Sequence, residues 1–112
     1  MIPYLVRKND RPKLSYPVAL NESNYDYLLS HPTNNLQVHI VEVKPGDSGS
    51  KKFTEYSSEE FILILEGKFE IQIEENTYIL NSGDSLTFSS SLNRLWKNTS
   101  IDTTQLLWIL YK

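Results

Sequence analysis

The chain has 112 residues, a net charge of −3 and no cysteine. Its length supports one domain with a modest core, and its 39% hydrophobic and 12% aromatic content excludes a disordered chain. The negative charge argues against direct binding of nucleic acid, and the lack of cysteine excludes disulfides, thiolate metal sites and a cysteine nucleophile.

The first two elements are expected in the proline-containing half of the chain. Within residues 22–31, ESNYDYLLSH, the alternation of Tyr25, Tyr27 and Leu29 predicts a strand, with a helix as the alternative. Residues 36–43, LQVHIVEV, are rich in β-branched side chains and end at a Lys-Pro-Gly turn signal, which predicts a second strand.

Two longer patterns follow. Residues 60–67, EFILILEG, are apolar at successive positions, which predicts a strand buried on both faces. Residues 68–75, KFEIQIEE, alternate between apolar and polar side chains and predict a strand with one buried face. Because Gly67 and Asn76 suit tight turns, we expect three consecutive antiparallel strands over residues 60–80.

The last part of the chain continues in the same way. Further strands are expected over residues 77–84, 85–90, 95–98 and 103–112. About ten short antiparallel strands with turns at short intervals predict an all-β sandwich or barrel.

The segment EEFILILEGKFEIQIEENTYILNSGDSLTF resembles the small β-barrel of the cupin superfamily. The first cupin motif ends in a Glu, six residues and a Gly, and Glu60 and Gly67 have that spacing. Gly83 and Asn98 stand at the two ends of the second motif. The resemblance implies a double-stranded β-helix, also called a jelly-roll barrel.

The resemblance covers nearly the whole chain and implies a single cupin domain over residues 1–112. Residues 1–35 are then N-terminal strands and lead-in, and residues 36–112 form the barrel core with both motifs. The lead-in is similar to that of the cupin sensor domain that follows a helix-turn-helix DNA-binding domain in bacterial transcription regulators.

The cupin metal site normally consists of three histidines and the Glu of the first motif. The resemblance places Glu60 at the family Glu and Arg94 at the last histidine. It places the two other histidines at Thr54 and Tyr56, or at Phe53 and Glu55. Imidazole provides the affinity for transition metals, and a permanently charged guanidinium repels a cation. We therefore expect neither a metal nor another cofactor.

The two histidines of the chain lie outside the motif positions. His31 precedes Pro32, so we expect it in a solvated loop. His39 lies in the middle of a predicted strand and is expected to face the barrel interior, as a structural or pocket-lining side chain rather than a metal ligand.

Arg94 has three interpretations. It can be a surface arginine on a distorted strand, the partner of Glu60 in an ion pair at the former metal position, or an anchor for the carboxylate or phosphate of a ligand. The last two interpretations are compatible with each other.

The same position predicts a pocket. Thr54 and Tyr56 would supply hydroxyls, and aromatic side chains would supply walls, unless they only pack in the core. Tyr78 and Trp108 are further candidates for these walls. We predict no catalytic residue and the following ligand-binding set: Thr54, Tyr56, Glu60, Arg94, His39, Phe88 and Trp96.

These features favour a non-catalytic barrel that binds a small ligand, anionic in one interpretation, as the sensor domain of a transcription regulator. The alternative is a metal-independent cupin enzyme of the sugar epimerase or isomerase kind, which would need an acid and a base beside its substrate. A metal-dependent oxygenase or isomerase is disfavoured by the missing ligands, and a purely dimerising role overlaps with the sensor.

The expected partners are a small-molecule ligand and a second copy of the chain in a homodimer. We expect no direct contact with nucleic acid and none with a membrane. No apolar run approaches membrane-spanning length and no signal peptide is evident, so a cytoplasmic location is expected.

Overall fold

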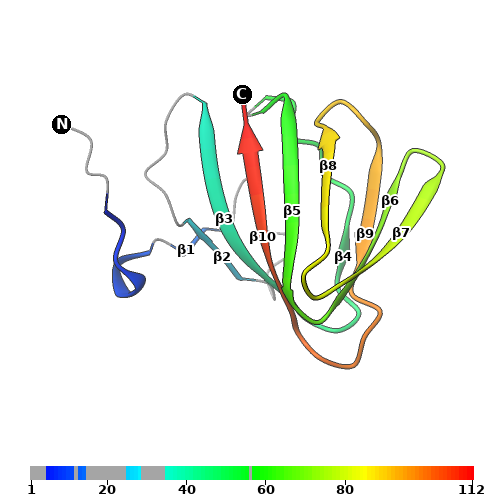
Figure 1. Cartoon of the computed structure of the whole chain (residues 1–112), viewed down its shortest axis with the longest axis horizontal. Coiled ribbons are helices and arrows are strands. Elements are labelled where there is room, and N and C mark those ends of the chain that lie inside the picture. The colour runs from blue at the N-terminus through cyan, green and yellow to red at the C-terminus, as the bar shows by residue number, and fades with distance from the viewer. Residues whose placement is uncertain (1–4, 12, 15–24, 29–34, 56) are drawn as a thin grey trace.

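The computed structural model describes residues 5–11, 13–14, 25–28, 35–55 and 57–112. These residues form ten strands in two antiparallel sheets and one short 3₁₀ turn, η1 (Lys8–Asp10) (Figure 1). The strands are β1 (Lys13–Leu14), β2 (Tyr25–Leu28), β3 (Leu36–Val43), β4 (Ser48–Gly49), β5 (Glu59–Glu66), β6 (Lys68–Ile73), β7 (Asn76–Asn81), β8 (Ser85–Ser89), β9 (Arg94–Lys97) and β10 (Thr104–Tyr111). The predicted all-β jelly-roll fold is confirmed.

The large sheet has the order β1-β2-β3-β10-β5-β8, and the small sheet has the order β4-β9-β6-β7. The last strand, β10, therefore lies between β3 and β5. It pairs with β3 along its whole length and with β5 from Gln105 to Tyr111. The segment expected as strand or helix over residues 22–31 is a strand where it is described, at β2, and the rest of it, including His31, lies outside the described residues.

The expectation of three consecutive antiparallel strands over residues 60–80 was wrong in its first half. β5 pairs with β10 and β8 in the large sheet, whereas β6 pairs with β7 and β9 in the small sheet. The turn at Gly67 thus carries the chain from one sheet to the other. Sequence periodicity cannot show this, because a hairpin and a sheet crossover both need a tight turn between two strands.

One local prediction also needs correction, and one strand was not predicted. The β6–β7 hairpin turns at Glu74 and Glu75, and Glu74 has the positive φ of 53°, while Asn76 already belongs to β7. The segment PGDSGS, which carries few strand-forming residues, contains the short strand β4, which pairs with β9.

The core lies between the two sheets and follows the alternation of the strands. Inward-facing side chains such as Val41, Ile62, Phe69 and Trp108 are completely buried. The prediction that residues 60–67 are buried on both faces was wrong: Phe61 and Leu63, on the outer face of β5, are only partly buried. The barrel covers one face of the large sheet.

Gly67 is constrained by its backbone and by its surroundings. Its φ is +93°, and a Cβ atom there would lie 2.7 Å from Oγ1 of Thr104. A residue with a Cβ atom pays about 1–2 kcal/mol for a left-handed backbone conformation. We expect Gly67→Ala to lower the free energy of unfolding by more than this amount, because Thr104 must also move. Gly83→Ala is the matched control, since Gly83 has a φ of +90° and no atom within 4 Å of its Cβ position. Urea denaturation measures both, and equal losses would contradict the steric part.

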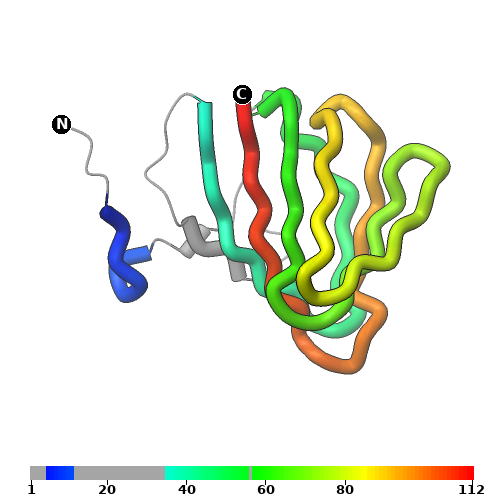
Figure 2. Tube along the Cα trace, viewed as in Figure 1, coloured from blue at the N-terminus to red at the C-terminus, as the bar shows by residue number. Residues whose placement is uncertain are grey.

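The barrel has two ends, which the tube in Figure 2 shows clearly. The turn at Gly67 and the segment between β9 and β10 lie at the lower end in this view. The segments that lead into β5 and β9 lie at the upper end, where Ser90 N donates to Ser58 O at 2.9 Å. The polar centre of the molecule lies close to this upper end.

Candidate functional site

Glu60 and Arg94 form a buried ion pair at the upper end of the barrel. Glu60 lies near the start of β5, and Arg94 is the first residue of β9. Nη1 of Arg94 donates to Oε1 of Glu60 at 2.6 Å, and both side chains are completely inaccessible to solvent. Of the three interpretations of Arg94, the surface arginine is thereby excluded, and the pairing with Glu60 is confirmed.

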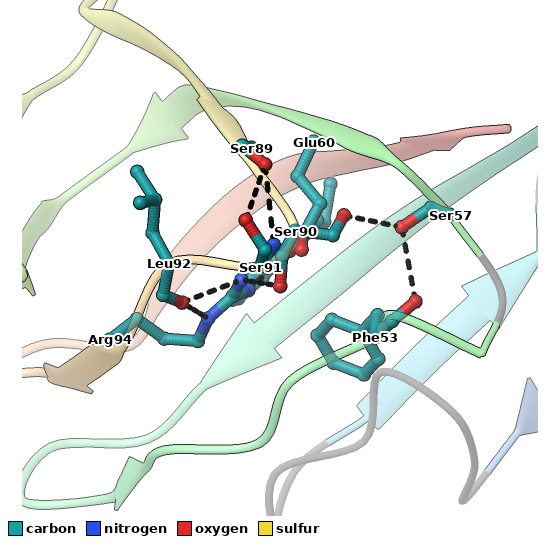
Figure 3. Close-up of polar contacts among 9 residues, drawn as sticks. Phe53, Ser57, Glu60, Ser89, Ser90, Ser91, Leu92 and Arg94 are labelled. Carbon is teal, nitrogen blue, oxygen red and sulfur yellow. Dashed lines mark hydrogen bonds and ion pairs between the residues drawn. The ribbon is translucent and has the colours of Figure 1, made fainter.

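The remaining donors of Arg94 bind the backbone of the segment between β8 and β9. Nη2 donates to Ser90 O at 2.9 Å and to Leu92 O at 3.3 Å, and Nε donates to Leu92 O at 3.3 Å. Figure 3 shows the guanidinium enclosed by these groups. A buried guanidinium is tolerated when its N–H groups have partners. In Arg94, each of the three nitrogens donates to at least one acceptor.

Trp108, on β10, supplies a second donor to the same carboxylate. Its Nε1 donates to Oε1 of Glu60 at 2.9 Å. The contact is a diagonal one across the sheet, because Glu60 lies opposite Leu110 and Trp108 lies opposite Ile62. The other carboxylate oxygen, Oε2, is buried and accepts no hydrogen bond from the described residues.

Aromatic rings surround the pair. The guanidinium carbon of Arg94 lies 4.8 Å from the ring centre of Phe88 and 5.9 Å from that of Phe53. Phe53 also makes an edge contact with Trp108, with 5.7 Å between ring centres. Such positions over an aromatic face stabilise a cation electrostatically.

The segment before β5 closes the barrel over the pair. Phe53 turns its ring inward and is 1% exposed. The hydroxyl of Ser57 lies 2.7 Å from that of Ser90 and donates to Phe53 O at 3.3 Å (Figure 3). Both serines are buried. These bonds hold the segment against the β8–β9 connection and keep the Phe53 ring in place.

The structure brings together only part of the predicted pocket. Glu60, Arg94 and Phe88 are in direct contact, whereas the side chain of Thr54 is exposed in a turn beside Phe53. Tyr56 lies outside the described residues. Of the other residues at the possible histidine positions, Phe53 is buried, whereas Glu55, like Thr54, is exposed.

The remaining predicted residues line the interior in other ways. His39 is completely buried, as expected, with Nε2 at 3.2 Å from Oε1 of Gln37. Trp96 packs on Trp108 with 5.0 Å between ring centres, and its buried Nε1 has no partner among the described residues. Tyr78 lies on the edge strand β7 with 39% of its surface exposed.

Sequence reasoning missed three contributions to this site. Phe53 was considered only as a histidine position, and Trp108 only as a wall. Ser57 and Ser90 were not assigned. The alternation of β10 already placed Trp108 inside, but its bond to Glu60 depends on the register between strands. No sequence signal marked the contact between the two serines.

The family's metal chemistry does not fit these residues. The single motif carboxylate, Glu60, is neutralised by a cation at hydrogen-bond distance, and Trp108 donates to the same oxygen. The described residues contain no group of three or more His, Cys, Asp or Glu side chains that could hold a metal ion. A first-row transition metal would need imidazole or several carboxylates here.

The bond from Trp108 to Glu60 leads to a prediction. Trp108→Phe removes the Nε1 donor but keeps most of the ring, so Glu60 loses one of its two hydrogen bonds in a buried position. We expect the free energy of unfolding to fall by about 2–4 kcal/mol, from the lost hydrogen bond to a charged group and the smaller ring. Urea denaturation measures the loss, and an unchanged stability would show that the bond contributes nothing.

Fold and site together define a class of protein: a two-sheet jelly-roll barrel with a carboxylate–guanidinium pair at its polar centre. The sequence profile of the cupin domain matches residues 39–110. The match covers more than half of the chain, and the chain belongs to the cupin domain family. A search of curated proteins found no match.

Solved structures share the fold at low sequence identity. An RmlC-like cupin from Shewanella frigidimarina has a TM-score of 0.77 at 10% identity, covering 97% of this chain and 90% of the other. The cupin domain of an XRE family transcriptional regulator from Enterobacter cloacae has a TM-score of 0.73 at 15% identity, covering 81% and 98%. KdgF from Halomonas sp. has a TM-score of 0.73 at 13% identity, covering 98% and 94%.

No helix among the described residues is both long and apolar enough to cross a membrane.

Proposed function

We propose that this chain is a non-catalytic, metal-free cupin barrel that binds a small ligand and acts as the sensor domain of a transcription regulator in the cytoplasm. One observation carries the proposal: a buried Glu60–Arg94 ion pair lies where the family's metal chemistry would need imidazole groups. The fold shared with the cupin domain of a transcriptional regulator supports the regulatory part.

The polar groups around the pair indicate which ligand it would accept. Arg94 is a fixed cation between two aromatic rings, which suits a small carboxylate or phosphate. Oε2 of Glu60 accepts no bond from the described residues, and a buried acceptor of this kind costs about 1–3 kcal/mol until a donor reaches it. A small acid that also carries a hydroxyl or amino group would satisfy both residues.

A ligand of this kind needs space beside Arg94. Phe53 occupies that side of the guanidinium, and its segment lies across the upper end of the barrel. We therefore expect the ligand to bind by displacing the Phe53 ring. Displacement of a side chain that is held by the Ser57–Ser90 contact would convert ligand binding into a change of shape at the barrel end, which is what a sensor requires.

The enzyme alternative is less well supported. Epimerase or isomerase chemistry needs a base and an acid that face the substrate. The motif carboxylate, Glu60, is paired with Arg94, and the buried His39 lies in contact with Gln37.

Thermal denaturation of the full chain tests ligand binding. The panel contains small carboxylates, hydroxy acids, amino acids and inorganic phosphate at equal ionic strength, with sodium chloride as the reference. We expect at least one organic acid to raise Tm in a saturable way. In Arg94→Met the shift should vanish, while Lys97→Met, on the same strand, should keep it.

Two results would overturn the proposal. The first is an anion-induced shift of equal size in Arg94→Met, because the guanidinium would then not contact the ligand. The second is stoichiometric transition metal in elemental analysis of the purified chain, because the site would then bind a metal ion. The proposed role in a transcription regulator predicts that the DNA upstream of Met1 encodes a helix-turn-helix domain in the same reading frame. A different kind of domain encoded there would count against this role.

A further inference from the structure

The lower end of the barrel in Figure 2, opposite the polar centre, is hollowed on both sides of the Gly67 turn. One groove, of about 700 Å³, lies between the β6–β7 hairpin and the segment that joins β9 to β10. A second groove, of about 560 Å³, lies beside the ends of β3 and β5 and the start of β10. Both are lined by Gly67 and Asp102, so they adjoin, and we call them together the lower groove. Its charged and large apolar lining residues are Glu42, Glu66, Lys68, Ile79, Ile101 and Asp102.

Two isoleucines give the lower groove an exposed apolar part. Ile79, on β7, is 53% exposed, and Ile101, in the segment between β9 and β10, is 92% exposed. Both line the larger of the two adjoining grooves, so one side chain of a partner can contact both. Covering them would remove apolar surface from water, which favours an occupant that carries an aliphatic side chain.

The segment that carries Ile101 is held in place before any partner arrives. The buried side chain of Asn98 donates through Nδ2 to Val43 O and to Asp102 O, each at 2.8 Å. Its Oδ1 accepts a hydrogen bond from Ser100 N at 2.9 Å. Ile101 therefore lies between two residues whose backbones are fixed by one side chain, and little conformational entropy remains to be lost on binding.

The charged residues of the lower groove are mainly acidic. Glu42 on β3 and Glu66 on β5 lie on either side of Gln105, their common neighbour across the sheet. Together with Asp102 they supply three carboxylates, against the single ammonium group of Lys68. Among the described residues, no cation forms an ion pair with any of the three carboxylates. This uncompensated negative charge favours a cationic occupant.

The same charge narrows the choice of occupant. Nucleic acid and an anionic membrane surface would be repelled. Two copies of the chain that met through this groove would bring like charges together, because a two-fold axis places each surface against itself. A polyamine would satisfy the carboxylates but has no branched side chain to offer Ile79 and Ile101. A protein segment can supply basic and aliphatic side chains together.

We propose that the lower groove binds an extended, basic segment of a partner protein. An aliphatic side chain of that segment packs against Ile79 and Ile101, and its lysine or arginine side chains pair with the three carboxylates. An extended segment suits the site because the groove continues around Gly67 from one sheet to the other. The inference does not depend on the ligand proposed above, since the polar centre lies at the opposite end of the barrel.

Phage display of random peptides of about twelve residues on the full chain tests the inference without assuming a particular partner. We expect the enriched peptides to combine several lysines or arginines with an isoleucine, leucine or valine. One such peptide, synthesised with a fluorescein label, should bind with a dissociation constant of about 1–100 µM in fluorescence anisotropy. Its affinity should fall about tenfold between about 50 and 500 mM sodium chloride, because salt screens exposed charges.

Two variants with matched controls locate the binding site of this peptide. Ile101→Ser should weaken binding about tenfold, whereas Leu95→Ser should not, since Leu95 is 56% exposed on the small sheet but does not line the lower groove. Glu66→Gln should weaken binding at low salt and much less at high salt. Glu59→Gln, at the other end of β5, should leave binding unchanged.

Three results would overturn the inference. They are a selection that enriches no peptide, enriched peptides without basic residues, and a peptide that binds Ile101→Ser and Glu66→Gln as tightly as wild type. Spermidine tests whether a small cation is the occupant. If it binds as tightly as the peptide, and equally well to Ile101→Ser, the lower groove is a polyamine site and the proposed protein partner is wrong.

Discussion

Arg94→Met is expected to lower the free energy of unfolding by about 3–5 kcal/mol, the loss typical of breaking a buried ion pair from one side. The cause is the carboxylate that remains. Glu60 would keep the hydrogen bond from Trp108 but would lie in the core with an unpaired charge. Urea denaturation followed by tryptophan fluorescence measures the loss, since Trp96 and Trp108 both lie in the core.

The double variant Glu60→Gln with Arg94→Met separates the ion pair from simple packing. If the penalty arises from the orphaned charge, the double variant should be more stable than Arg94→Met alone by more than about 1 kcal/mol. Equal stabilities would mean that the loss comes from the missing backbone hydrogen bonds and ring contacts of the guanidinium, and not from the orphaned charge of Glu60.

Lys97→Met is the matched control on the same strand. Lys97 pairs with Glu70 at 3.3 Å, but its side chain is 54% exposed. An exposed pair of this kind contributes about 0–1 kcal/mol, so this variant should be nearly as stable as wild type. A loss comparable to that of Arg94→Met would contradict the role assigned to burial.

Phe53→Ala is expected to cost about 3–5 kcal/mol in unfolding free energy, as for other fully buried phenylalanines. The ring is lost from its contacts with Trp108 and Arg94, and the cavity that it leaves lies beside the guanidinium. Leu95→Ala is the control, since a 56% exposed side chain should change stability by no more than about 0.5 kcal/mol. A loss below about 1 kcal/mol in Phe53→Ala would show that the ring is easily displaced even without ligand.

The same variant tests whether the space under Phe53 accepts an anion. Benzoate combines the lost ring with a carboxylate, so it should raise the Tm of Phe53→Ala by more than it raises that of wild type. Benzyl alcohol, which lacks the charge, should have the smaller effect. If the two compounds act equally, the cavity binds an apolar ring without help from Arg94.

Several features of the fold could be predicted from the sequence because they depend on neighbouring residues. The β-branched side chains and the turn signal after them predicted β3, and the alternation of apolar and polar side chains predicted β6 closely. The burial of His39 follows from the opposite directions of successive side chains in a strand. The assignment of β5 and β6 to one hairpin failed, because the choice between the sheets depends on β10, which lies about 40 residues further along the chain.

For the candidate site, the sequence by itself determined which chemistry is missing. The spacing between Glu60 and Gly67 indicated the cupin motif, and the residues at the histidine positions carry no imidazole. The tertiary structure alone decided where Arg94 points and what closes the barrel. The ion pair joins residues 34 positions apart, and the Ser57–Ser90 contact joins residues 33 apart. Residue types and spacing are local properties, whereas these contacts exist only once the strand registers and the crossover at Gly67 bring the segments together.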